Sequence, residues 1–66
     1  MKIVYNLETD TLTITLREER IRESDEVRPG VIADFGYDGQ NVRFEILSAS
    51  KVVTRPQAMA VELQEA

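Results

Sequence analysis

The chain has 66 residues, a net charge of -4, and neither cysteine nor histidine. A chain of this length builds only one hydrophobic core, and without cysteine or histidine it has no disulfide and lacks the preferred donors of zinc, iron and copper sites. The acidic balance argues against binding to DNA or RNA, which requires clustered lysine and arginine. No segment resembles a signal peptide or a membrane span of about 20 apolar residues. We therefore expect one cytoplasmic domain over residues 1–66, without a cofactor, that self-associates for stability.

The first predicted element is a β-hairpin. Residues 2–6 are rich in β-branched and aromatic side chains, and residues 11–16 alternate threonine with apolar residues, which is the period of a half-buried strand. Between them, Asn6 and Asp10 supply side chains that hydrogen-bond to nearby backbone groups in turns. The alternation directs three side chains to the core: Leu12, Ile14 and Leu16.

The next segment, residues 17–28, is dominated by charges of both signs, and only Ile21 and Val27 are apolar. This composition fits a solvated loop or an edge strand, where charged side chains discourage pairing with other chains. We favour a short strand over residues 20–23, and a helix remains the alternative. Pro29-Gly30 ends the element, because proline fixes φ and glycine adopts positive φ.

A second hairpin is predicted from residues 31–35 and 41–47, which are joined by residues 37–40. Asp38-Gly39 between two apolar alternations is a strong hairpin signal, and we expect a primed turn with positive φ at both of these residues. The second strand of this hairpin points three side chains toward the core: Val42, Phe44 and Ile46.

The C-terminal part is predicted to be helical. Ser48 or Ser50 is expected to cap one helical turn that runs through Val53, and Thr54 and Gln57 have the spacing of a capping box. Pro56 fits an early helical position, so a helix is expected from about residue 56 to residue 64. The fold class that follows is α+β: a small antiparallel β-sheet of four to five strands, built from hairpins, with a short C-terminal helix.

Three groups of residues together resemble one known family, the bacterial domain-of-unknown-function family 2283. They are Tyr5, Glu8, Asp10, Leu12, Ile14 and Leu16; then Val27, Pro29, Gly30, Val31, Ile32 and Asp34; then Glu45, Ile46, Leu47, Ala49, Ser50 and Lys51. The resemblance covers residues 1–53 and leaves the tail, residues 54–66, outside. One departure is Arg43-Phe44, where the family pattern usually has a glycine. The resemblance implies a compact antiparallel sheet with a helix and no enzymatic activity. Members are sometimes encoded beside a small toxin-like ribonuclease domain, which implies an antitoxin role as a hypothesis.

The residues themselves show no catalytic or metal motif. The chain has many carboxylates, among them Asp25, Glu26, Asp34 and Glu45, but acid–base catalysis needs paired groups and the usual nucleophilic triads need a base such as histidine. We therefore expect no enzymatic activity and no catalytic residue. Asp34 and Asp38-Gly39 lack the spacing of a calcium loop, so we expect Asp34 to point to solvent or to bond a neighbouring strand.

A second face of the sheet carries the most functional information. If the core side chains occupy one face, then Val4, Ile32 and Leu47 lie on the other, where a soluble monomer would place polar residues. Either the C-terminal helix covers them through residues such as Met59 and Leu63, or this surface meets a second copy or another protein. These five residues form our candidate interaction surface.

From this surface, the acidic charge and the family resemblance, we expect a non-enzymatic protein-interaction domain that forms a homodimer and acts as an antitoxin-like partner of a small basic toxin. The alternative is a self-contained structural homodimer, or an accessory or small-ligand-binding subunit.

Overall fold

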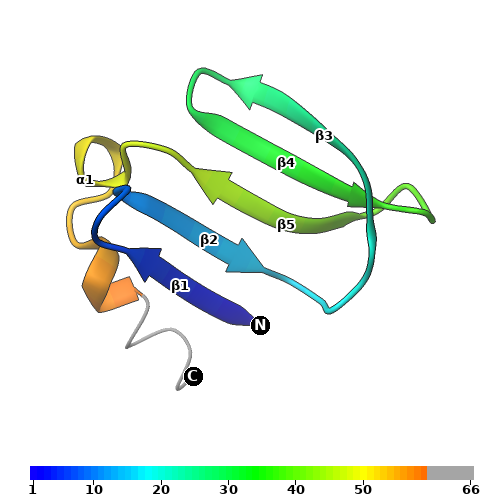
Figure 1. The fold of residues 1–66 in the computed structure, drawn as a ribbon, viewed down its shortest axis with the longest axis horizontal. Helices are drawn as coiled ribbons and strands as arrows, with labels where there is room; N and C mark the ends of the chain where they lie inside the picture. The colour runs from blue at the N-terminus through cyan, green and yellow to red at the C-terminus, as the bar shows by residue number, and fades with distance from the viewer. Residues whose placement is uncertain (60–66) are drawn as a thin grey trace.

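The computed structural model describes residues 1–59 as a five-stranded antiparallel sheet with two short helical segments at its C-terminal end (Figure 1). The strand order is β1-β2-β5-β4-β3, so the α+β prediction is confirmed. The elements are β1 (Lys2–Asn6), β2 (Thr11–Thr15), β3 (Ile21–Arg28), β4 (Val31–Gly36), β5 (Asn41–Ile46) and α1 (Ala49–Val52).

The first hairpin is confirmed. Strands β1 and β2 pair with Ile3 opposite Ile14 and Tyr5 opposite Leu12. The Asn6 carboxamide oxygen accepts the backbone N–H groups that follow in the turn, those of residues 8 and 9 at 3.0 and 3.2 Å. Asp10 has a φ of 53°, a left-handed conformation that aspartate tolerates better than most side chains do.

The second hairpin is confirmed, but its turn differs from the expected primed type. Gly39 has a φ of 80°, whereas Asp38 keeps a negative φ. The Gly39 N–H donates to the Gly36 carbonyl, and the Gly36 N–H donates to the Gln40 carbonyl, so the loop is longer than two residues. Asp38 is held in this loop because its carboxylate accepts the Gln40 N–H at 3.0 Å and the Arg17 guanidinium at 2.7 Å.

The charged segment forms strand β3 at the edge of the sheet, next to β4. The edge-strand interpretation is therefore confirmed over the helix, but the expected bounds, residues 20–23, were too short. The strand continues to Arg28 because Gly30, with a φ of 78°, turns the chain directly into β4 and places Arg28 opposite Val31. The turn extends the strand pairing through charged residues that, from their composition alone, could equally have formed a solvated loop.

The hydrophobic core lies on one face of the sheet, which we call the core face. Strand alternation and the cross-strand register place the apolar residues of the first two strands and of β5 on this side. Ile3, Leu12 and Ala49 are 0–1% exposed and form the buried centre. Partly buried side chains pack around them: Tyr5, Ile14, Ile46, Val53 and Met59.

The helical segments pack over one end of the core face. In Figure 1, α1 and the second helical segment lie beside β1 and β2, and the chain between β2 and β3 crosses the end of β4. Ser48 precedes α1 with a φ of 50° but makes no capping bond through its side chain. The second segment begins at Pro56, and the Met59 N–H donates to the Arg55 carbonyl. The capping box at Thr54 and Gln57 was therefore one residue out of register, and residues 60–64 of the predicted helix lie outside the described residues.

Candidate functional site

The structure separates the residues of the candidate interaction surface. Val4 and Ile32 do lie on the face opposite the core, but Thr13 and Glu45 stand between them in the same cross-strand row. Val4 is 45% exposed. Val4 and Ile32 therefore lie on the first and the last of four neighbouring strands, and three strand spacings of about 4.8 Å separate them.

The remaining three members lie elsewhere. Leu47, 40% exposed, follows the end of β5, and its N–H donates to the Gly30 carbonyl. Met59 packs on the core face against the buried centre, so the described part of the C-terminal helix does not cover Val4 and Ile32. Leu63 lies outside the described residues. The five residues do not form one continuous surface.

A different apolar surface is left open on the core face. It consists of Val31 and Phe35 on β4 and Phe44 on β5, and we call these three residues the open apolar half. All three are partly exposed, and none belongs to the packed centre. Ala33 faces Phe44 across the ladder and is itself buried, at 1% exposed. Strand alternation and the cross-strand register place these residues on the core face, but nothing in the sequence indicated that the helical segments pack elsewhere.

The cause of that packing is a hydrogen-bonded cluster around Asp10. Its carboxylate accepts the Ser50 N–H at 3.0 Å, the Ser50 hydroxyl at 2.7 Å and the Tyr5 hydroxyl, while its carbonyl accepts the Ala49 N–H at 2.8 Å. Asp10 therefore satisfies two N–H groups at the start of α1 that have no partner within the helix. The serine capping that we expected is replaced by an aspartate 40 residues away. Tyr5, Asp10 and Ser50 all belong to the residue pattern on which the family resemblance rests.

The same contacts shift two titrations. The hydrogen bond to Asp10 raises the pKa of Tyr5, because the carboxylate holds the phenolic proton. The hydrogen bonds from Tyr5 and Ser50 lower the pKa of Asp10 below its ordinary value. Since a lowered carboxyl pKa stabilises the folded state only while the group is charged, this contribution is lost as the pH falls below about 4.

Replacing Asp10 with alanine is expected to loosen α1 from the sheet. The thermal midpoint should fall by a few degrees, and the amides of Ala49 and Ser50 should exchange faster with solvent, because both lose their acceptor. Asp10→Asn keeps an acceptor and tolerates the left-handed backbone, so its effect should be smaller. Circular dichroism and amide exchange by NMR check this. The assignment is wrong if Asp10→Ala leaves exchange at these two amides as slow as Glu8→Ala does.

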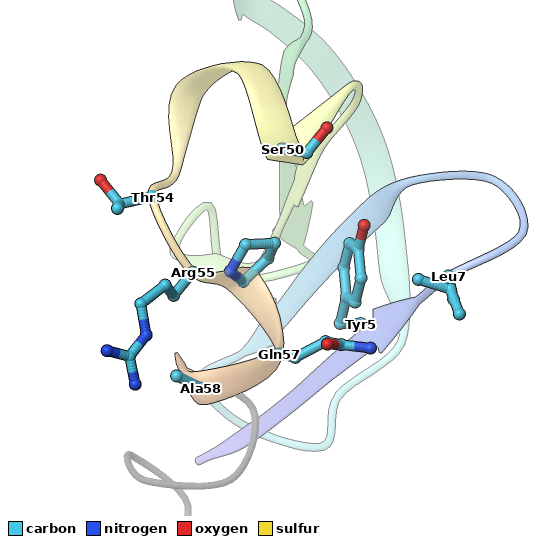
Figure 2. A pocket seen from close by; sticks show the side chains of 8 residues that line it. Tyr5, Leu7, Ser50, Thr54, Arg55, Gln57 and Ala58 are labelled. Atoms are coloured by element: carbon cyan, nitrogen blue, oxygen red, sulfur yellow. The ribbon is translucent and has the colours of Figure 1, made fainter.

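A hollow of about 420 Å³ lies between this cluster and the second helical segment. Figure 2 shows the Tyr5 ring and the Gln57 amide on the same side of it, while Arg55 extends away from them. The walls combine apolar surface from Leu7 and Pro56 with the hydroxyl of Ser50. Such a mixed lining suits a small ligand or a partner side chain.

The opposite face carries a buried ionic cluster centred on Asp34. This carboxylate is 0% exposed; it accepts the Arg43 guanidinium at 2.7 Å from β5 and the Ser24 hydroxyl from β3. Glu45 lies 3.6 Å from the same guanidinium. Of the two expectations for Asp34, bonding to neighbouring strands is the observed one, and the structure pairs Asp34 with Glu45 although the sequence had given no sign of paired carboxylates.

The pKa values of Asp34 and Glu45 are shifted in opposite directions. Burial alone would raise the pKa of Asp34, but hydrogen bonds from Glu45, Ser24 and Arg43 outweigh it and lower that pKa. The pKa of Glu45 is raised, first by its hydrogen bond with Asp34 and then by burial, while Arg43 opposes both. The arrangement joins three strands through Asp34 and shifts the pKa values of its two carboxyl groups apart.

This pairing predicts a pH-dependent effect of Glu45→Gln. A raised carboxyl pKa means that the folded state holds the proton more tightly, so its stability declines as the pH rises above about 4.5. Glutamine keeps an N–H donor for Asp34 without needing a proton. We expect the free energy of unfolding of the variant, measured with urea relative to that of the parent, to be higher at pH 7 than at pH 4. The exposed control Glu18→Gln should show the same difference at both pH values.

Within residues 1–59, no group of three or more acidic side chains is arranged to hold a metal ion. No helix in the described part of the chain is long and apolar enough to cross a membrane.

The geometry defines a small α+β domain whose sheet is covered by helix over only part of its core face. Residues 2–50 match the family model described as "Protein of unknown function (DUF2283)", and because the match spans most of the 66 residues, the chain belongs to this family. The chain matches no curated protein and no solved structure.

Proposed function

We propose that this chain is a non-enzymatic, cytoplasmic protein-interaction domain that forms a homodimer and acts as the antitoxin-like partner of a small basic protein. The observation that supports it is the open apolar half. Two phenylalanines, Phe35 and Phe44, stand partly exposed on the face that holds the core, and covering their remaining exposed surface contributes part of the roughly 1.5–3 kcal/mol that full burial of such a side chain is worth.

A second copy is the proposed cover for this surface. A domain of 66 residues with no disulfide has little stability to spare, and an isologous contact lets the same patch cover itself. The net charge of -4 then accounts for the second partner, because an acidic surface accelerates encounter with a basic protein.

The hollow beside Tyr5 and Ser50 supports one other candidate function. A self-contained homodimer that binds a small ligand, or serves as an accessory subunit, would use this volume of about 420 Å³. Its walls offer a hydroxyl, an amide and apolar surface, which fits a small polar ligand with an apolar part.

The experiment combines light scattering of the purified chain with a pull-down from native lysate. We expect a dimer and one small basic protein bound in stoichiometric amount, with the dimer lost in Phe35→Ser and kept in the matched exposed control Leu7→Ser. A monomer that captures nothing would overturn the proposal. A dimer that captures nothing but binds a small molecule would favour the second candidate.

A further inference from the structure

The outer edge of β3 is exposed, and a partner site on it rests on the proposed function. We propose that residues 23–26 of β3 bind a short extended segment of the basic partner, which adds a sixth antiparallel strand to the sheet. The segment carries lysine or arginine at alternate positions. This mode of recognition uses main-chain hydrogen bonds for affinity and side chains for specificity.

The edge is open along its length. Strand β3 ends the strand order and pairs only with β4 among the described strands. Figure 1 shows no described segment on its far side. It has eight residues, more than any other strand, and all but Ile21 are exposed. A strand at the edge of a sheet presents a row of backbone N–H and C=O groups that a further strand can pair with.

Two irregularities limit the length of the docking segment. The register with β4 shifts between Ile21 and Glu23 and again between Glu26 and Arg28. Between these shifts the pairing is regular, from Glu23 opposite Phe35 to Glu26 opposite Ile32. Bulges twist an edge and interrupt pairing. The regular window, residues 23–26, therefore accepts a partner strand of about four residues, and a longer strand would not pair along its whole length.

Charge decides which strand fits this window. Three of its four residues are acidic, Glu23, Asp25 and Glu26, and the ion pairs of residues 1–59 involve none of them. A second copy of β3 pairing antiparallel across the window would set Glu23 opposite Glu26 or Asp25. Like charges directly opposite each other destabilise a strand pair. The edge therefore rejects its own copy and favours a basic strand.

The core face adds a place for one basic side chain. Glu23, Asp25 and Phe35 line a hollow of about 420 Å³ at this edge. A lysine or arginine of the added strand would bring its charged end to the two carboxylates at the rim of this hollow. The hollow adjoins the open apolar half through Phe35.

The probe for this site is a six-residue peptide that alternates lysine with valine, added to the isotope-labelled full chain. We expect NMR shift changes centred on Ser24 and Asp25 and slower amide exchange along β3. The double reversal Glu23→Lys, Asp25→Lys should weaken binding about tenfold. The control Glu8→Lys, Glu18→Lys makes the same change in net charge at exposed positions away from β3 and should change binding by less than about twofold.

Equal weakening by both double variants would overturn the inference, because it would mean binding through net charge alone. Shift changes away from β3 would overturn it as well. If the reversal unfolds the chain, the neutral pair Glu23→Gln, Asp25→Asn provides the same comparison. A natural partner that binds the reversed edge as tightly as the parent would refute the docking site and leave the proposed function standing, whereas absence of any partner refutes the function itself.

Discussion

Replacing Leu12 with alanine is expected to destabilise the domain by about 2–5 kcal/mol. Leu12 is 0% exposed at the centre of the packed cluster between Ile3 and Ala49. Leucine-to-alanine changes in a core cost about 2–5 kcal/mol, through lost burial and the cavity that remains. A chain of this size has a total stability of roughly 3–10 kcal/mol. One substitution therefore removes a large part of the free energy of folding.

Urea unfolding followed by circular dichroism checks this expectation. The matched control is Leu7→Ala, because Leu7 lies in the first turn and is 69% exposed. The control should unfold within about 0.5 kcal/mol of the parent. Similar losses in the two variants would show that Leu12 does not occupy the centre of the core.

The second large effect is expected at Asp34. Asp34→Asn removes the charge that pairs with Arg43 and that raises the pKa of Glu45, and it can present an amide N–H to groups that are themselves donors. Hydrogen bonds to charged groups contribute about 1.5–3 kcal/mol each, so we expect a loss of about 2 kcal/mol, reduced by the partial exposure of Arg43. The control is Asp25→Asn, which neutralises the exposed neighbouring carboxylate on β3.

NMR titration of Glu45 separates this role from a general packing defect. The pKa of Glu45 is raised chiefly by Asp34, so it should fall toward its ordinary value in Asp34→Asn and stay raised in Asp25→Asn. An unchanged Glu45 titration in Asp34→Asn would contradict the pairing. Loss of stability alone, without this change, would not identify the cluster.

Most of the fold could be predicted from local sequence patterns. The β-branched and aromatic composition located β1, and period-two alternation located β2, β4 and β5, because side chains point alternately to a buried and a less buried face. Pro29-Gly30 marked the β3–β4 turn. The extent of β3 was not visible, because its burial pattern is exposed almost throughout and its pairing depends on the neighbouring strand and not on its own side chains.

The sites were harder to predict because their contacts join residues that are far apart in the sequence. The Asp38-Gly39 hairpin does place Asp34 opposite Arg43 when pairs are counted outward from the turn, so that ion pair could have been found. Asp10 and Ser50 meet across 40 residues, and no short-range pattern announces such a contact. The location of the open apolar half follows from this single anchoring contact, which fixes the helical segments at the other end of the sheet.

The strand order also shapes how the chain folds. Strands β1 and β2 form one local hairpin, and β3, β4 and β5 form a meander of neighbours in sequence. The β2–β5 ladder and the hydrogen bond from the Leu16 N–H to the Val42 carbonyl join these two units. Joining them closes a loop of roughly 25 residues, which costs more chain entropy than either turn. We therefore expect formation of the β2–β5 ladder to limit the rate of folding, so that substitutions along it slow refolding more than equally destabilising changes at the edges of the sheet do, as stopped-flow refolding would measure.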